Sequence, residues 1–490
     1  MLGFFNSLEP PGRSSDPIGD FRGKSVSIML LMIAMILIAA IITDHFFVGV
    51  LILLVPGVLL LIGGSPLRVT LMVFIMHLLI PIGSLRQASI GGLRSDEILL
   101  LLIVGLWLLS LPDRSMKGLR IGKQGYFLVA FLILFAVSVY RGINLGRSTE
   151  SLIEQFRTFG AYFMYFPLLW ILSDEDNTRW IWKALLVSSA VGSVILLGKG
   201  YFMYGSNLVI RETTGLRVID RQQNAFGAVL LMYIGRIWKG ANRKAVLVFA
   251  VPIITVVSGA IVISQTRGLW YGILVALASA WLLNLFRKKD DTKLGKKLIT
   301  SLTALAVVVI LAVLTVSALG ILSTTELSER TGTDTGSYLT DTSTLSRLVA
   351  WSAILEELSG SAIITGKGAG ALYTCYRPDL RGVVTLYYVD GSYFQIALVM
   401  GLLGVFCLLG IFLTTALRAA KLFLSTDNQV RAGIALGLFS ATLMLLFASI
   451  FASVLTGYRF TTSLWMFIPA MLQNEILREE KESEQSKETI

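Results

Sequence analysis

Asp390 is the residue of this chain best placed to do chemistry. It stands just before the apolar run that starts at Ser392, at the end of a long polar segment. The chain has two histidines, His45 and His77, and neither belongs to that segment. A carboxylate is therefore the expected proton acceptor if the segment carries out acid–base chemistry. A hydrated residue at a membrane boundary is the simpler interpretation of Asp390.

The polar segments on the predicted outer side of the membrane, which includes Asp390, are rich in arginine. Lysine is nearly absent from them and occurs at Lys199 and Lys367. A guanidinium group pairs with two phosphate oxygens at once, whereas an ammonium group is a point charge. The bias favours a diphosphate site, and retention of lysine on the opposite side is the alternative explanation. These arginines are Arg86, Arg94, Arg141, Arg147, Arg211, Arg217, Arg221, Arg267, Arg330, Arg347, Arg377, Arg381 and Arg459.

The composition is that of a membrane protein. Of 490 residues, 55% are hydrophobic and 15% are charged, whereas soluble domains carry about 25% charged residues. Many apolar runs approach the roughly 20 residues that a membrane helix needs. The predicted fold class is an all-α polytopic membrane protein with about fourteen transmembrane helices. The predicted spans are residues 26–43, 46–63, 69–83, 97–112, 125–140, 153–172, 180–200, 224–238, 245–263, 268–286, 298–321, 393–416, 433–453 and 460–475.

Lysine-containing loops determine the predicted orientation. The segments RSMKGLRIGK, RIWKGANRK, RKKDDTKLGKK and RAAK fall on one side with both termini, and the positive-inside rule makes that side the cytoplasm. The first residues lack the compact apolar core of a signal peptide. The net charge of +11 therefore reflects topology, and no nucleic-acid partner is expected. The expected segments are a cytoplasmic tail at 1–25, transmembrane helices 1–11 at 26–321, a large outer loop at 322–392, transmembrane helices 12–14 at 393–475 and a charged cytoplasmic tail at 476–490.

The loop at 322–392 is far longer than the usual connection of roughly 4–6 residues, and loops of that size are usually functional or disordered. It opens with a Ser/Thr-rich segment that is expected to be mobile, and then contains LSRLVAWSAILEEL. In this stretch Leu348, Trp351, Leu355 and Leu358 recur at spacings of three and four, which predicts an amphipathic helix. Ser346 or Thr344 is the expected N-cap, and the helix is expected to lie on the membrane surface or over a cavity.

Other motifs have ordinary structural explanations beside functional ones. Arg267, in SQTRG, is either a turn residue or a site residue, and Asn224 is either a helix cap or part of a site. The stretch ITGKGAGAL lacks the GK[ST] ending of a nucleotide-binding loop, so a tight turn that packs against the membrane is predicted. Cys375 and Cys407 show no metal-binding spacing and predict no disulfide.

Four features in their order resemble the O-antigen ligase and O-antigen polymerase superfamily, which are type C (GT-C) membrane glycosyltransferases. They are RETTGLRVIDRQQNAFG, with Gly215, Asn224 and Gly227; ISQTRGLWYG, with Ser264, Arg267, Gly268 and Gly272; SRLVAWSAILEEL followed by GKGAG, with Ser346, Arg347, Trp351, Ala353, Gly366, Gly368 and Gly370; and VDGSYFQIALVMGLLG. The resemblance covers residues 205–415 well and the first 200 residues only by hydropathy.

One departure from the family pattern separates two activities. Ligases of this superfamily carry a histidine, often His-Asn, where this chain has Asp390 and Gly391. Polymerase-type members more often show Asp, then a small or amide residue, and then Tyr. The order Asp390, Gly391, Ser392 and Tyr393 is similar to the second pattern. The resemblance therefore favours a polymerase, with a ligase as the alternative.

The resemblance implies transfer of a glycan from a polyprenyl diphosphate, with undecaprenol as the expected polyprenol, at the outer face of the bacterial inner membrane and without a metal or other cofactor. Arg267 and Arg347 would stabilise the leaving diphosphate. Asp390 would orient or deprotonate the acceptor hydroxyl. Expected partners are the lipid-linked glycan donor and acceptor, the lipid bilayer, a chain-length regulator and a flippase. Further expected contacts are Arg211, Arg217 and Arg221 to the diphosphate, and Tyr393 and Asn224 to the acceptor.

A transporter or flippase of lipid-linked sugars is the alternative from another class. Transporters usually show internal repeats and charged residues near the middle of the bilayer. This sequence shows no convincing repeat, and its outer charges gather at the membrane rim. A non-catalytic scaffold would explain neither the arginine bias nor the order of the motifs.

Overall fold

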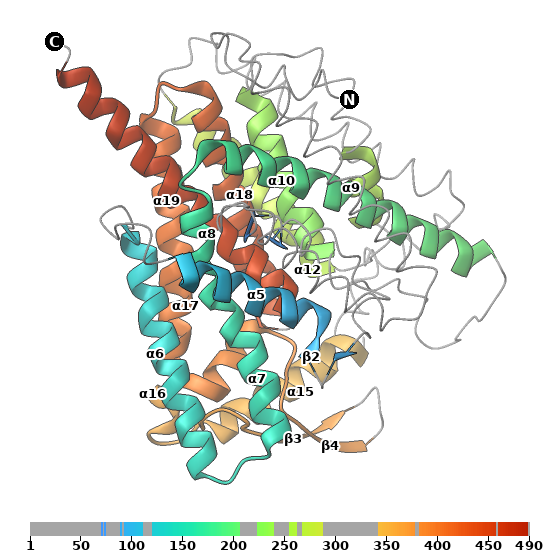
Figure 1. Cartoon of the computed structure of the whole chain (residues 1–490). Helices are drawn as coiled ribbons and strands as arrows, with labels where there is room; N and C mark the ends of the chain where they lie inside the picture. The colour runs from blue at the N-terminus through green and yellow to red at the C-terminus, as the bar shows by residue number, and fades with distance from the viewer. Residues whose placement is uncertain are drawn as a thin grey trace. The chain divides into compact units, whose positions relative to one another are not determined.

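The computed structural model describes most of the second half of the chain and parts of the first, and the described part is mostly helical (Figure 1). The chain divides into two compact units, each described by itself below. The N-terminal tail, the predicted spans at 26–43, 46–63 and 298–321, and the expected mobile segment before residue 342 lie outside the described residues. The described residues are 70–71, 73–74, 89–90, 93–110, 120–205, 223–239, 254–261, 267–287, 342–377, 382–456 and 459–488.

The first unit comprises residues 1–119, 170–192 and 240–253. Its described elements are the short antiparallel pair β1 (Ser89–Ile90) and β2 (Leu93–Arg94), α5 (Ser95–Ser110) and the first part of α9 (Glu175–Gly205). Two side chains at the start of α9 satisfy the carbonyls that precede it. Asn177 donates to Ile171 O at 3.2 Å and Thr178 to Leu172 O at 3.1 Å, which closes the turn that enters the helix.

The second unit holds most of the described residues and every described site residue. Its elements are α6 (Gly122–Asn144), α7 (Thr149–Gly160), η3 (Ala161–Met164), the start of α8 (Tyr165–Ile171), the end of α9, α10 (Gln223–Lys239), α12 (Arg267–Leu285), α15 (Thr342–Glu357), α16 (Ala362–Thr365), β3 (Tyr373–Arg377), β4 (Gly382–Leu386), α17 (Ser392–Ser425), α18 (Gln429–Phe451) and α19 (Arg459–Glu488).

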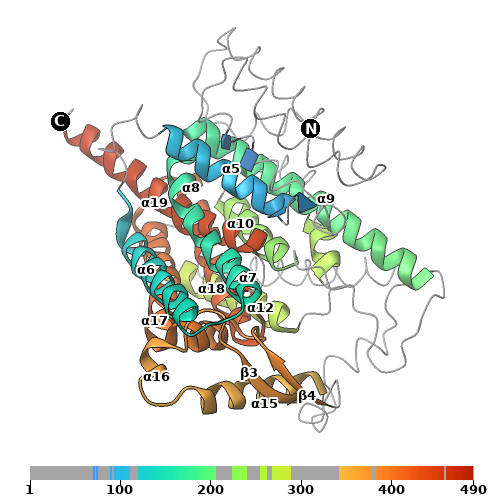
Figure 2. The ribbon, with the colours of Figure 1, turned by 60° about the horizontal axis from the view of Figure 1, so that its bottom comes forward.

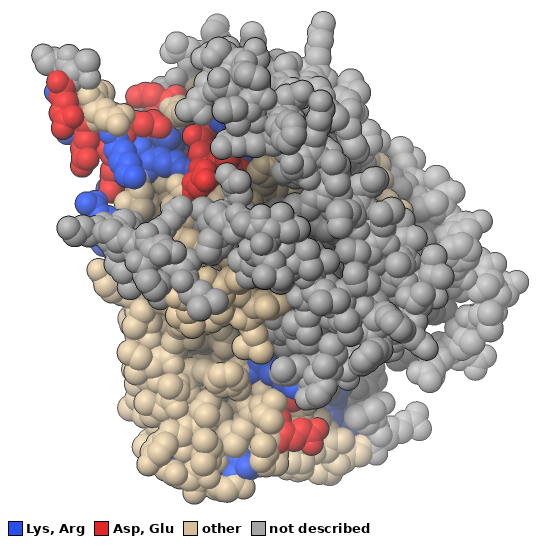
Figure 3. Space-filling view, in the orientation of Figure 1, with Lys and Arg blue, Asp and Glu red and all other residues tan. Residues whose placement is uncertain are grey.

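Within the described ranges, four helices are long and apolar enough to cross a membrane. They agree with four of the predicted spans, and the remaining predicted spans stay predictions. Figure 3 shows the matching surface pattern, with charged residues at the two ends of the described surface and an uncharged band between them. The four helices are Gly122–Asn144, Gly268–Leu285, Ser392–Ser425 and Gln429–Phe451.

The segment at 153–172, which hydropathy predicts as one span, is divided in the structure. It forms α7, the 3-10 turn η3 and α8 in succession. Ser148 caps α7 by accepting the Ser151 backbone N–H at 3.3 Å. Glu154 and Arg157 form an ion pair of 2.9 Å on α7. The polar character of α7 explains why hydropathy alone extends the apolar run too far toward the N-terminus.

Helix α18 packs against α10, α12 and α17. Small residues allow this close approach. A Cβ added to Gly235 in α10 would collide with the backbone of Gly437 in α18, and one added to Gly272 in α12 would lie 3.0 Å from Met444 O. Glycine at such crossings is typical of membrane helices, whose association depends on close van der Waals packing.

Helix α17 is broken at Gly401, which has φ 69° and ψ −167°. The glycine-rich loop 366–370 enters this break. Lys367 N donates to Leu398 O at 2.8 Å and Gly368 N donates to Val399 O at 3.1 Å. The loop thus satisfies helix carbonyls that the break leaves open. The loop is thus a tight turn, as predicted, and its backbone N–H groups are used in hydrogen bonds to α17.

The described part of the large loop contains α15, α16 and the antiparallel hairpin β3–β4, which gather at one end of α6 and α17 (Figure 2). Helix α15 starts at Thr342, before the expected caps, and Ser346 is buried inside it. Ala350 and Ile354 are buried in the core cluster with the hairpin, and Trp351 and Leu358 of the predicted stripe pack against it. Leu348 and Leu355 are exposed, so a contact of these two residues with the membrane stays a prediction. The hairpin therefore determines which face of α15 is covered.

Candidate functional site

The candidate site lies where α15 meets the start of α17. Arg347 belongs to the second turn of α15, and Asp390 precedes α17 by two residues. The Arg347 Nε lies 3.5 Å from the Asp390 Oδ2, and the two side chains are 30% and 50% exposed. The structure thus brings together two of the predicted catalytic residues on a surface that a ligand can reach.

Buried amide side chains fix the main chain before Asp390. Gln395, in the first turn of α17, donates through Nε2 to Tyr387 O at 2.9 Å and accepts the Val389 N–H at 2.9 Å through Oε1. Gln155, on α7, donates to the same Tyr387 carbonyl at 3.3 Å. Gln155 also accepts the Gly370 N–H at 2.8 Å. One side chain therefore links the glycine-rich loop to the segment that ends at Asp390.

A buried phenol adds another restraint from the hairpin. Tyr373, the first residue of β3, donates its hydroxyl to Tyr388 O at 3.0 Å. Burial, more than the neighbouring Cys375, raises the pKa of the Tyr373 phenol well above its ordinary value. The phenol therefore stays protonated and keeps its role as a donor.

Trp351 holds Asp390 from the side of α15. Its Nε1 donates to the Asp390 backbone carbonyl at 2.6 Å, and its ring stacks on Phe394 at 4.8 Å between centroids. Gly391 has φ 106°, and a Cβ there would lie 3.0 Å from Ile450 O and 3.2 Å from the Trp351 Nε1. Only glycine fits this conformation without strain. The Asp390–Gly391 peptide is therefore fixed by sterics and by a hydrogen bond.

The Arg347 guanidinium is incompletely paired. Its Nε is buried, and it has no hydrogen-bond partner within the described part of the chain, because the approach to Asp390 at 3.5 Å does not form one. A buried donor without a partner costs about 1–3 kcal/mol, and such groups in native proteins need an explanation. An anionic ligand that accepts from Arg347 would remove this cost.

Tyr393 occupies a different direction from Asp390. Its hydroxyl donates to Leu446 O in α18 at 2.7 Å. The neighbouring Ser392 accepts the Leu455 N–H at 2.9 Å, which joins the start of α17 to the segment after α18. Both hydroxyls thus anchor α17, and a contact between Tyr393 and the acceptor stays a prediction.

The other predicted site residues are only partly described. Arg267 is the first residue of α12, but its side chain lies outside the described atoms. The same holds for the side chain of Asn224, near the start of α10. Their roles stay predictions, as do those of three residues outside the described ranges: Arg211, Arg217 and Arg221.

The sequence-based prediction omitted Gln155, Gln395 and Tyr373 from the site. Gln395 carried a usable signal, because an amide inside the apolar run that follows Asp390 requires hydrogen-bond partners once it is buried. Gln155 and Tyr373 act from distant positions in the sequence, so neither residue pattern nor spacing identifies them. Within the described residues, no group of three His, Cys, Asp or Glu side chains is placed to hold a metal ion.

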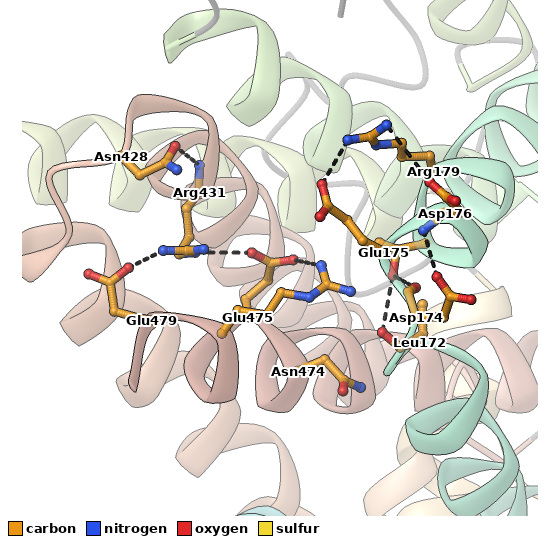
Figure 4. Close-up of polar contacts among 12 residues, drawn as sticks. Leu172, Asp174, Glu175, Asp176, Arg179, Asn428, Arg431, Asn474, Glu475 and Glu479 are labelled. Carbon is orange, nitrogen blue, oxygen red and sulfur yellow. Dashed lines mark hydrogen bonds and ion pairs between the residues drawn. The ribbon is translucent and has the colours of Figure 1, made fainter. Parts of the chain in front are cut away.

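A second charged cluster lies at the other end of α17 and is named here the α19 cluster: Arg431, Glu475, Glu479 and Glu482. Arg431 Nε contacts Glu475 at 3.3 Å and its Nη1 binds Glu479 (Figure 4). Its Nη2 contacts Glu482 at 2.7 Å. Most of the predicted charged tail at 476–490 is helical, because α19 continues to Glu488. Glutamates spaced by four and three residues share one helix face and converge on Arg431.

A comparison with protein families gives one match. The family model described as O-Antigen ligase matches residues 252–409. The matched segment is about a third of the chain and contains Arg267, Arg347 and Asp390. No curated protein matches the sequence. The family match supports the predicted resemblance and a role in glycan assembly.

Proposed function

We propose that this member of the O-antigen ligase and polymerase superfamily is a membrane glycosyltransferase that polymerises polyprenyl-diphosphate-linked repeat units into a surface polysaccharide, at the outer face of the bacterial inner membrane. The observation that carries the proposal is the Arg347–Asp390 pair, with its atoms 3.5 Å apart on a restrained main chain. The pair lies inside the segment that matches the O-antigen ligase family.

The proposed reaction requires a base and a cation in contact. The acceptor hydroxyl oxygen attacks the anomeric carbon of the donor and forms the new glycosidic bond. The bond from that carbon to the diphosphate breaks, and its electron pair leaves with polyprenyl diphosphate. The hydroxyl proton passes to Asp390 or, through its hydrogen bond, to water. Asp390 also orients the hydroxyl, because a carboxylate oxygen accepts the hydroxyl hydrogen bond.

Arg347 has the complementary role toward the leaving group. Negative charge grows on the diphosphate as the glycosidic bond breaks, and a fixed guanidinium stabilises that charge. The Arg347 side chain is 30% exposed, so the outer N–H groups of its guanidinium can donate to a phosphate oxygen. Arg267 is proposed as the second cation, and Arg211, Arg217 and Arg221 as outer contacts to the diphosphate.

Two features favour different acceptors. The order Asp390, Gly391, Ser392 and Tyr393 supports a polymerase, in which the acceptor is a second lipid-linked repeat unit. The matched family is described as O-Antigen ligase, which supports transfer to lipid A core or another acceptor as the second candidate. The same pair of side chains serves both reactions, because the donor and the leaving group are the same.

Reconstitution tests the proposal. Purified protein in nanodiscs is incubated with lipid-linked repeat units from its host, without nucleotide or energy source, and the products are separated by length. Polymers released with polyprenyl diphosphate support a polymerase, whereas products on added lipid A core support a ligase. Translocation in proteoliposomes without bond formation would contradict both and indicate a transporter.

Matched variants locate the site in the same assay. Arg347→Ala and Asp390→Asn are each expected to lower transfer at least a hundredfold while the protein remains folded. Lys367 and Glu357 form a similarly exposed ion pair in the same loop, so Lys367→Ala and Glu357→Gln serve as controls and should keep most of the activity. Full activity of Arg347→Ala or Asp390→Asn would exclude this pair as the active site.

A further inference from the structure

Tyr388 shares one side of the main chain with Asp390. Tyr388 is 54% exposed and the Asp390 side chain is 50% exposed, whereas Val389 between them is 2% exposed. Tyr388 and Asp390 thus both face away from the core that buries Val389. Two residues of chain span at most about 7 Å, so the two Cα atoms lie no farther apart than that. A flat aromatic ring therefore stands beside the proposed catalytic carboxylate.

The Tyr388 ring is exposed but held in place. Its backbone carbonyl accepts the Tyr373 hydroxyl at 3.0 Å. The ring meets the Tyr387 ring edge-on, with centroids 5.7 Å apart and planes inclined by 72°. The Tyr387 carbonyl is in turn bound by Gln155 and Gln395. Little conformational entropy remains to be lost when a ligand covers this ring.

We propose that Tyr388 and Asp390 form the subsite for the acceptor sugar. The inference rests on the proposed function and names the part of the substrate that this surface takes. A pyranose ring has an apolar C–H face and a rim of hydroxyls. The Tyr388 ring covers the C–H face, because an aromatic ring offers a large rigid contact at low entropic cost. The Asp390 carboxylate accepts a hydrogen bond from the hydroxyl that reacts.

The positions of the two side chains give each a separate effect on the kinetics. Contact with the Tyr388 ring is made equally in the ground state and in the transition state, so its loss raises the KM for the acceptor. Asp390 acts on the proton that moves, so its loss lowers kcat. Tyr388 is therefore a specificity residue, and its replacement should leave the chemical step nearly unchanged.

Tyr376 provides a matched control for the experiment. It is a tyrosine on β3 of the same hairpin and is 51% exposed. Tyr388→Ala, Tyr388→Phe and Tyr376→Ala are compared in the nanodisc transfer assay. Tyr388→Ala is expected to raise the acceptor KM about tenfold with kcat within twofold, because one stacking contact is lost. The values for Tyr376→Ala should stay close to those of the wild type, and Tyr388→Phe, which keeps the ring, should raise the KM less than Tyr388→Ala does.

Binding without turnover separates this inference from the proposed function. The probe is the free repeat-unit oligosaccharide, released by mild acid from the host's own surface polysaccharide. Saturation-transfer NMR should show its ring protons on wild-type protein and on Tyr376→Ala, and a strongly reduced signal on Tyr388→Ala. Equal signals from Tyr388→Ala and wild type, or none from wild type, would overturn the subsite. If the wild-type protein binds the probe through Tyr388 but transfers no glycan, the result would contradict the proposed polymerase activity and leave the sugar subsite standing.

A lipid contact is the other use of an exposed aromatic ring at a membrane boundary. In that case Tyr388→Ala would weaken partition of the protein into the bilayer and lower kcat and stability together, with an unchanged acceptor KM. That pattern would also overturn the sugar subsite.

Discussion

Two arginines lie near opposite ends of α17 and differ in the number of carboxylates that they contact. Arg431, in the α19 cluster, is 6% exposed and contacts three carboxylates, including the 5% exposed Glu475. Arg347, in the candidate site, is 30% exposed and approaches one carboxylate at 3.5 Å. The 34 residues of α17, with the break at Gly401, lie between the two clusters. The pairing of each arginine is therefore determined by the residues around it.

The two clusters differ in where their hydrogen bonds are directed. In the α19 cluster the side chains bind each other, and Thr426 adds a bond of 3.0 Å to Glu479. In the candidate site the restraints act on the main chain, while the Arg347 Nε has no hydrogen-bond partner within the described residues. A closed network of charges stabilises the fold. An open pair on a fixed backbone contributes little stability and leaves its charges for a ligand.

Removal of Arg431 should have the largest effect on stability. Arg431→Ala removes the buried cation that three carboxylates share and leaves Arg478 as the remaining cation partner of the buried Glu475. Breaking a buried pair costs about 3–5 kcal/mol in comparable cases. Arg347→Ala should cost less than about 1 kcal/mol, because an exposed pair contributes little. Thermal unfolding in detergent measures both variants. Equal losses of stability would contradict the distinction between the two clusters.

The contact between the glycine-rich loop and α17 should come next in size. Gly401→Ala requires a positive φ for alanine and places its Cβ against the Ile364 carbonyl. The expected cost is about 2–4 kcal/mol, as the sum of backbone strain and overpacking. Gly146 has φ 65° with no atom within 4 Å of an added Cβ, so Gly146→Ala isolates the strain. A smaller loss from Gly401→Ala than from Gly146→Ala would show that the loop does not enter the helix break.

Replacement of Trp351 should act on the open site. Trp351→Phe keeps an aromatic ring over Phe394 but removes the hydrogen bond to the Asp390 carbonyl. The stability loss should be about 1 kcal/mol. Transfer should fall about tenfold in kcat, because the carboxylate loses a fixed position. Unchanged kcat with the same stability loss would reduce Trp351 to a packing residue.

Acid should weaken the α19 cluster by the smallest amount. Hydrogen bonding to Arg431 is the main cause that lowers the pKa of Glu482 from its ordinary value. Because the folded-state pKa is the lower one, the stabilisation is present above the ordinary carboxyl pKa of about 4.3 and is lost as pH falls through the lowered value. Unfolding temperatures between pH 7 and pH 3 measure this loss. Glu482→Gln should reduce the dependence, and an unaltered pH profile would contradict the assignment.

The sequence predicts the helical class and the Arg347–Asp390 region because these depend on local signals. Apolar runs locate α6, α12, α17 and α18, since lipid requires length and hydrophobicity and little else. The scarcity of histidine and the order of the motifs direct attention to Asp390. These signals depend on short stretches of chain, so they can be recognised without knowledge of the tertiary contacts.

The remaining features depend on partners that are distant in the sequence. The burial of Ala350 and Ile354 in α15 depends on the hairpin that packs against them. The glutamate spacing in α19 is visible in the sequence, but Arg431 as its partner is not. Likewise, the restraint of Asp390 by Gln155 requires α7, the glycine-rich loop and the loop before α17 to meet.

The central claim is that the open arginine–carboxylate pair, and not a saturated one, is the catalytic site. Single-turnover transfer from lipid-linked repeat units by Asp390→Asn, beside the Glu357→Gln control, tests it most directly. The account predicts that Asp390→Asn unfolds at nearly the wild-type temperature but transfers at least a hundredfold more slowly, while Glu357→Gln transfers normally. Transfer by Asp390→Asn at the rate of Glu357→Gln would contradict the account.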